Sequence, residues 1–245
     1  MNPLDLQYQN LLTDILDNGT IKGDRTGTGT TSVFGRTIRH HMRDGFPLLT
    51  TKKMYTRGIV AELLWFIKGS TNIQWLVQNR CNIWNGDAYK KYVIQTQAAH
   101  DKMVIDNSTC DFQPFEPALS ISEFAEKIKT DDVFAKRYGD LGPIYGEQWR
   151  NFGGTKTAIE IDDAGNPTKW ENTGGVDQFT NMINTLKTNP DGRRIMVTAW
   201  NPQNVHLATL PPCHYGFQVY TRELSENERW SWYKRQGASD MHHDH

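Results

Sequence analysis

The sequence predicts a fold of the α+β class. Apolar residues recur at helical spacing in some segments, and others have the composition of strands. These segments do not follow the regular β-α-β order of a doubly wound sheet, which favours α+β. Apolar residues make up 37% of the 245-residue chain and aromatic residues 11%, enough for a sizeable core. We therefore expect one domain over residues 1–245.

The N-terminal third predicts two helical regions separated by a loop and a strand. Residues 3–18 have helical spacing, and a glycine follows them. The Gly/Thr-rich segment 24–30 predicts a loop that leads into a strand over residues 31–42. Residues 56–68 predict a helix that is buried on most sides, and residues 71–78 a second, short helix.

The middle of the chain contains two polar segments. Residues 93–136 are interpreted as an insertion, in which Ser120 and Glu123 have the spacing of a capping box and so predict a helix start. Residues 155–175 predict a hairpin or loop. Residues 176–187 have the apolar spacing of an amphipathic helix.

The last part of the chain predicts strands followed by a polar segment. Residues 194–200 and 214–220 predict strands. From residue 221 onward no closing helix or strand is predicted. The final histidines could bind a metal, but a solvated tail is the simpler interpretation, so we predict no metal site.

Charge and cysteine content restrict the function classes. Lys plus Arg total 27 and Asp plus Glu 28, so the basic excess of a polynucleotide-binding protein is absent. Cys81, Cys110 and Cys213 form no Cys-x-x-Cys pair, which argues against a disulfide framework or zinc ribbon and for a reducing compartment. The longest apolar run, residues 59–67, is shorter than the ~20 residues that span a bilayer, and the N-terminus has no secretory signal. We expect a cytoplasmic protein.

Cys213 is the candidate nucleophile. It follows two prolines and precedes His214 at the start of a predicted strand. A thiolate with cationic groups nearby is a covalent catalyst, whereas a free cysteine can also be a small buried residue. Alternation along a strand sends His214 to the opposite face, so we expect it to be a hydrogen-bonding group rather than the base for Cys213.

Three arginines are candidates for binding an anion. Arg193 and Arg194 open a predicted strand, and paired guanidinium groups can clamp a phosphate. Arg25 is the only cation of the Gly/Thr-rich loop, which lacks the ending of a P-loop. Surface solubility is the alternative for Arg193 and Arg194, and the loop that holds Arg25 is by itself a weak phosphate signal.

Glu62 is a carboxylate within an apolar helix. It is either paired, and then structural, or faces a cleft, where burial would raise its pKa and let it exchange protons near neutral pH. Trp84 and Tyr145 follow loop-like segments, and either could flank a flat ligand or fill the core.

Taken in order, five segments resemble the thymidylate synthase family. The similarity covers nearly everything from residue 5 to 220, apart from 93–136 and a loop near 155–175. The segments are residues 24–30, 62–66, 139–150, 193–202 and 211–214.

The resemblance implies the fold and the substrate site. It implies a large bent β-sheet flanked by helices and used for dimerisation. Cys213 would attack the sixth ring carbon of deoxyuridine monophosphate (dUMP). Arg25, Arg193 and Arg194 would bind the phosphate, and Arg193 and Arg194 would reach the site of the other subunit, which implies a homodimer.

The resemblance also implies roles for the remaining candidates. Glu62 would run a proton relay through water, and His214 would join a hydrogen-bond network near the fourth-position oxygen of the pyrimidine. Tyr145 would help to remove the proton from the fifth carbon. Trp84, with Glu62, would serve methylenetetrahydrofolate, the co-substrate that donates one carbon and a hydride.

The resemblance ends before the family's C-terminal part. We expect a chain truncated after the Pro-Cys-His segment and its following strand, without part of the sheet. Three alternatives stay open: a deoxypyrimidine-monophosphate hydroxymethylase of the same family, an inactive fragment or binding protein, and a Cys-His hydrolase. The last needs a base that faces Cys213, and the sequence offers none.

Overall fold

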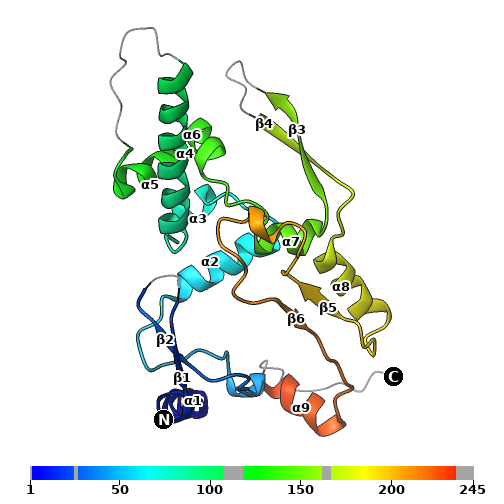
Figure 1. Cartoon of the computed structure of the whole chain (residues 1–245). Helices are drawn as coiled ribbons and strands as arrows, with labels where there is room; N and C mark the ends of the chain where they lie inside the picture. Colours follow the sequence, from blue (N-terminus) through cyan, green and yellow to red (C-terminus); the bar gives the residue numbers. More distant parts are fainter. Residues whose placement is uncertain (1, 25–26, 107–117, 162–166, 236–245) are drawn as a thin grey trace. The chain divides into compact units, whose positions relative to one another are not determined.

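The computed structural model describes residues 2–24, 27–106, 118–161 and 167–235 (Figure 1). The chain forms two compact units, Met1–Thr56 and Arg57–His245. Helices and short strands occur without regular alternation, which confirms the α+β class. Within the described ranges, no helix has both the length and the apolar composition needed to cross a bilayer.

Where the structure describes it, the first unit contains a long helix, a short hairpin and a 3-10 turn. Its elements are α1 (Pro3–Asn18), β1 (Thr20–Lys22), β2 (Thr30–Ser32) and η1 (Met42–Asp44). Asn2 caps α1, because its side-chain oxygen accepts a hydrogen bond from Leu4 N at 3.0 Å. The strand predicted over residues 31–42 is shorter than expected, since Gly35 has a φ of 67° and the extended conformation stops before it.

The second unit contains most of the helices and the apolar core. Its first elements are α2 (Thr56–Ile67), α3 (Gln74–Gln78), α4 (Asn85–Asp106), α5 (Ile121–Thr130), α6 (Asp132–Tyr138) and α7 (Tyr145–Asn151). They are followed by β3 (Thr155–Ile161), β4 (Pro167–Thr173), α8 (Gln178–Thr188), β5 (Met196–Thr198), η2 (Val205–Leu207), β6 (Gly216–Gln218) and α9 (Glu226–Arg235). The core includes fully buried side chains from α2, α3, α5 and β5, among them Trp65, Leu76, Phe124 and Val197.

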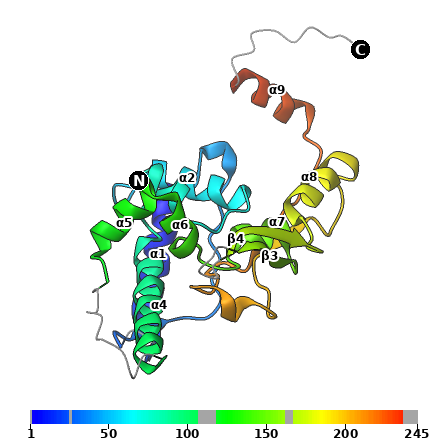
Figure 2. The same ribbon diagram turned by 90° about the horizontal axis from the view of Figure 1, so that it is seen from above.

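The segment predicted to be an insertion forms helices that pack on one another. Figure 2 shows α5 and α6 beside α4. Tyr92 of α4 contacts Phe124 of α5 and Tyr138 of α6, with ring centroids 5.1 Å and 4.9 Å apart. The predicted capping box is confirmed, because Ser120 and Glu123 exchange hydrogen bonds at the start of α5. α4 begins at Asn85, before the expected insertion, and so joins it to the core.

The described strands form three separate antiparallel pairs, β1–β2, β3–β4 and β5–β6. Of the hairpin or loop predicted over residues 155–175, the structure shows the antiparallel pair of a hairpin, formed by β3 and β4. The expectation of a large bent sheet is corrected by the structure, because no sheet in the described parts of the chain has more than two strands. β5 and β6 each have only three residues in the ladder, which is shorter than the predicted strands over 194–200 and 214–220.

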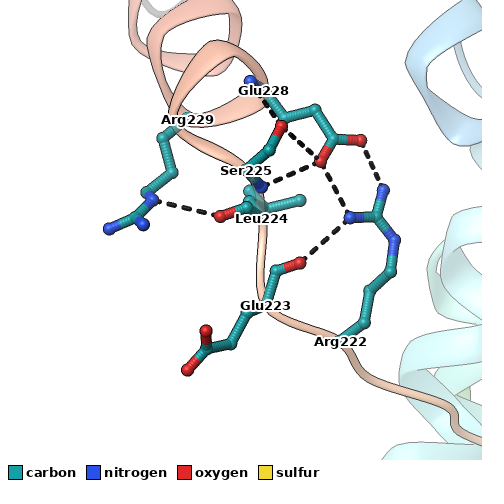
Figure 3. Close-up of polar contacts among 6 residues, drawn as sticks. All are labelled: Arg222, Glu223, Leu224, Ser225, Glu228 and Arg229. Carbon is teal, nitrogen blue, oxygen red and sulfur yellow. Dashed lines mark hydrogen bonds and ion pairs between the residues drawn. The ribbon is translucent and has the colours of Figure 1, made fainter.

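The segment after residue 220 contains a helix that the sequence analysis did not predict. α9 begins after Ser225, which forms a second capping box with Glu228 (Figure 3). Arg222 donates two hydrogen bonds to the Glu228 carboxylate, at 2.8 Å and 2.5 Å, and so adds an ion pair to this cap. The prediction of no closing helix was therefore wrong.

Candidate active site

Tyr145 is held in place by the loop that precedes α7. The Asp140 carboxylate accepts hydrogen bonds from the Thr71 hydroxyl at 2.7 Å and from Gly142 N at 2.6 Å. The first bond ties Asp140 to the segment between α2 and α3, and the second closes the turn from Asp140 to Gly142. Tyr145 is the first residue of α7 and is 4% exposed. Its ring is therefore placed by a loop with defined hydrogen bonds.

α7 also packs closely on the turn that follows α2. A Cβ atom added to Gly146 would lie 2.7 Å from the Ser70 carbonyl oxygen, closer than real Cβ atoms come to such a neighbour. The absence of a side chain at Gly146 thus lets α7 approach the backbone of this turn. The same contact brings Phe66 of α2 to Tyr145, with ring centroids 4.7 Å apart.

Cys213 and His214 both contact Tyr145. The Cys213 N–H donates a hydrogen bond to the Tyr145 hydroxyl at 2.5 Å. The His214 ring stacks on the Tyr145 ring, with centroids 4.2 Å apart and an interplanar angle of 20°. Cys213 and His214 lie in a bend before β6, so strand alternation does not apply to them. Cys213 is a free and exposed thiol.

Burial changes the acidity of the two rings that stack. It lowers the pKa of His214, because the charged imidazolium loses water. It raises the pKa of the Tyr145 phenol, an effect that the bond from Cys213 N–H partly opposes. At neutral pH this favours a neutral imidazole and a protonated phenol. The neutral imidazole and the phenol hydroxyl can then each donate a hydrogen bond to a neutral heterocycle or accept one from it.

Glu62 is hydrogen-bonded to Trp84. The Trp84 indole Nε1–H donates to Glu62 Oε1 at 2.9 Å. Burial raises the pKa of Glu62, and the bond from Trp84 opposes part of this effect. Trp84 is 6% exposed, and its ring meets Tyr145 edge-on with centroids 6.2 Å apart. Glu62, Trp84, Tyr145, Cys213 and His214 thus form one connected group.

Arg193 and Arg194 lie away from this group. In the antiparallel ladder Met196 pairs with Gln218, and Thr198 pairs with Gly216. The arginines come just before Met196, whereas Cys213 comes just before Gly216. Because β5 and β6 are antiparallel, the arginines and Cys213 lie at opposite ends of this strand pair. The stretch from Arg194 to Thr198, a rise of four residues, spans about 13 Å at the rise of a strand and separates the arginines from the end near Cys213. Arg193 lines a hollow of about 460 Å³ at its own end of the hairpin.

Other candidates lie outside the described residues or outside this group. Arg25, Cys110 and the terminal histidines belong to the parts of the chain that are not described. Cys81 is buried, and its thiol donates to the Gly58 carbonyl oxygen at 3.6 Å. Where side chains are described, no group of three or more His, Cys, Asp or Glu is placed to hold a metal ion.

Several polar residues of the site were missed in the sequence analysis. Gln148 is 1% exposed, and its amide bonds to Pro143 O and to Asn204 and Asn201. It therefore joins α7 to the segment after β5. The surrounding sequence gives no clear signal for it, because Glu147 and Arg150 are polar as well, and only the structure shows the partners that this buried amide needs.

The sequence matches the model of a protein family described as thymidylate synthase over residues 6–242. The chain belongs to the thymidylate synthase family. It is 44% identical over 216 residues to the thymidylate synthase of Phytoplasma mali, covering 88% of this chain and 62% of that protein. It is 44% identical over 214 residues to that of Mycoplasma mobile, covering 87% and 61%. It is 39% identical over 222 residues to that of Listeria innocua, covering 89% and 65%.

The chain spans about three fifths of the length of the curated relatives that it matches. Four of the five thymidylate synthase segments lie in the second unit, where residues 62–66, 139–150 and 211–214 meet around Tyr145. Residues 193–202 join them through Asn201, which bonds to Gln148 at 3.2 Å. The relatives compared carry the name thymidylate synthase, which does not favour the hydroxymethylase alternative.

Proposed function

We propose that this chain carries the nucleophile-bearing part of a thymidylate synthase, which converts dUMP to thymidylate. The observation that supports this most directly is the exposed thiol of Cys213. The main-chain N–H of the same residue donates to the Tyr145 hydroxyl, and the His214 ring stacks on the Tyr145 ring. A thiol in this setting is open to an incoming ring carbon. The neighbouring phenol and imidazole can bind the polar edge of the same ring.

The Cys213 thiolate would form a bond to the sixth carbon of the pyrimidine while the double bond between the fifth and sixth carbons opens toward the fifth, and the sulfur–carbon bond would break again when the product leaves. His214, kept neutral by its lowered pKa, would bind near the fourth-position oxygen. Tyr145 would assist the removal of the proton from the fifth carbon. Glu62, whose pKa is raised by burial, can hold or release a proton close to neutral pH and would serve the relay through water.

The phosphate of dUMP would be bound by Arg25, Arg193 and Arg194. Arg193 and Arg194 lie at the far end of the β5–β6 ladder from Cys213. This separation supports a site in which the two arginines come from a second copy of the chain. We therefore propose a homodimer in which each copy lends these arginines to its partner.

Methylenetetrahydrofolate would supply the one-carbon unit and the hydride. The residues present fit a flat heterocycle of this kind, because aromatic rings surround Tyr145 and the Glu62 carboxyl lies among them. Trp84, with Glu62, would contact the folate. Since Trp84 is 6% exposed, this contact would be limited in area. The free thiols of Cys81 and Cys213 support a reducing compartment, and we propose the cytoplasm.

Covalent trapping tests this function. The chain is incubated with 5-fluoro-deoxyuridine monophosphate and methylenetetrahydrofolate, and its intact mass is measured. We expect an adduct that maps to Cys213, disappears in Cys213→Ser and persists in Cys81→Ala. A folded chain that binds the nucleotide without forming the adduct would instead be a binding protein. A folded chain that does neither would contradict the proposal.

A further inference from the structure

One side chain bonds both to α7, the helix that carries Tyr145, and to β5, the strand that pairs with β6 just after Cys213. Gln178 is the first residue of α8. Its Nε2 donates to the Gln148 carbonyl oxygen of α7 at 2.7 Å and to the Thr198 carbonyl oxygen of β5 at 2.8 Å. Its Oε1 accepts from Thr198 N at 3.0 Å. The amide thus bonds β5 as a neighbouring strand would.

Each of these backbone partners is close to one half of the site. Gln148 lies three residues after Tyr145 on the same short helix. Thr198 pairs with Gly216, and its hydroxyl donates to the Tyr215 carbonyl oxygen at 3.0 Å, directly after the Cys213–His214 bend. A displacement of β5 relative to α7 would therefore change the distance between Cys213 N and the Tyr145 hydroxyl.

The chemistry of the side chain matters as well as its size. Only a primary amide supplies two donors for the two carbonyl groups and one acceptor for Thr198 N. A carboxylate would place negative charge against both carbonyl oxygens. A thioether of similar length would leave the carbonyls and the N–H without these bonds. The three bonds therefore specify glutamine.

We propose that Gln178 is a positioning residue that sets the register between β5 and α7 and thereby the Cys213–Tyr145 contact. It acts through the backbone and touches no reacting atom. This inference deepens the proposed function, on which it rests for the role of Cys213. The contact itself can be measured without substrate.

The first experiment compares Gln178→Met with the unmodified chain. Hydrogen exchange by NMR gives the protection factor of the Cys213 amide, which is the intrinsic exchange rate divided by the observed one. We expect it to fall at least about 10-fold, as for the loss of a hydrogen bond. Gln218→Met is the matched control, because the Gln218 amide donates to the Arg193 carbonyl oxygen at 3.1 Å at the far end of the same hairpin. In Gln218→Met we expect the Cys213 protection factor to change by less than about 3-fold.

The second experiment uses Gln178→Glu and varies the pH. The ionised carboxylate cannot donate, whereas the protonated acid can donate to one of the two carbonyls. We expect Cys213 protection to be low at neutral pH and to recover as the pH falls, a reversal within one folded variant. A folded Gln178→Met with unchanged Cys213 protection would overturn the proposal, as would a Gln178→Glu profile identical to that of the unmodified chain. Failure of the trapping experiment in the unmodified chain would instead contradict the proposed function alone.

Discussion

Glu62 combines two environments that act in opposite directions on one carboxyl group. The apolar side chains of α2 and the core withdraw it from water, which favours the neutral acid. The Trp84 indole N–H donates to it, which favours the anion. Burial is the larger effect, so the pKa is raised. The indole is thus the group that limits how far the pKa rises.

Replacing Trp84 by Phe is expected to raise the pKa of Glu62 further. The variant keeps an aromatic ring in the core but removes the indole N–H that donates to Oε1, while burial remains. The pKa is measured by ¹³C NMR titration of the Glu62 carboxyl. Trp65→Phe is the matched control, because the Trp65 indole donates to the Asn72 carbonyl oxygen rather than to Glu62. An unchanged or lower pKa in Trp84→Phe would contradict the assignment.

The same shift has a consequence for stability. A carboxyl group whose folded-state pKa is raised favours the folded state at low pH, and this contribution is lost as the pH rises through the folded pKa. The free energy of unfolding should therefore decline as the pH rises from the ordinary pKa of 4.5 through the raised pKa of Glu62. Glu62→Gln should weaken this decline, which urea unfolding at several pH values can measure.

At the scale of elements, α9 depends on a local set of side chains before its first turn. The hydrogen bonds from Arg222, and to a smaller extent those from Ser225, lower the pKa of Glu228 to about 2. The carboxylate accepts from Ser225 N and from Arg222 at once (Figure 3). The start of the helix is therefore tied to the charge of one half-buried glutamate.

Acid should weaken the start of α9. A carboxyl with a depressed folded pKa contributes stability above its ordinary pKa of 4.5, and the contribution is lost as the pH falls toward about 2. We expect the amides that follow Ser225 to lose protection over this range in NMR hydrogen exchange. In Arg222→Gln the Glu228 titration should move to higher pH. A Glu228 titration that stays near pH 2 in this variant would show that Arg222 is not the cause.

The elements that were predicted from the sequence have strong local signals. α1 and α8 follow their apolar spacing, and α5 follows its capping box. α9 has the same Ser-x-x-Glu signal but little apolar periodicity, because its tryptophans and tyrosine lie on a polar helix, and it was missed. β2, β5 and β6 are shorter than predicted, since the length of a ladder depends on partners that local composition does not reveal.

The candidate site shows the same limit at the level of side chains. Cys213, Tyr145, His214, Glu62 and Trp84 were selected from the sequence, and the structure brings them into one group. Their contacts could not be predicted, because they join segments that are far apart in the chain. Gln178 was missed because, in the sequence, it is only an ordinary residue at a helix start.

At the scale of the whole molecule, burial is divided unevenly between the two units. Among the described residues of Met1–Thr56, only Leu4 and Asp5 are buried. The Asp5 carboxylate accepts hydrogen bonds from the Thr50 N–H and hydroxyl, which lower its pKa. Arg57–His245 contains the large cluster of apolar side chains. The first unit is therefore held by a few polar contacts.

Hydrogen exchange should show two levels of stability. Local opening costs less free energy where few apolar side chains are buried. We expect the amides of β1 and β2 to exchange at least about 10-fold faster than those of α7, after correction for intrinsic rates. Exchange followed by mass spectrometry of proteolytic fragments measures this. Equal protection in both units would contradict the interpretation.

Position 213 is anchored through its main-chain nitrogen, which donates to the Tyr145 hydroxyl whatever side chain the position carries. The atom that would react and the atom that fixes its place are therefore different, and the side chain can be exchanged without loss of the anchor. Serine, cysteine and selenocysteine at this position would form a graded series of nucleophiles on one backbone frame. Differences in their reactivity would then report the chemistry of oxygen, sulfur and selenium together with the side-chain hydrogen bond between position 213 and Tyr145.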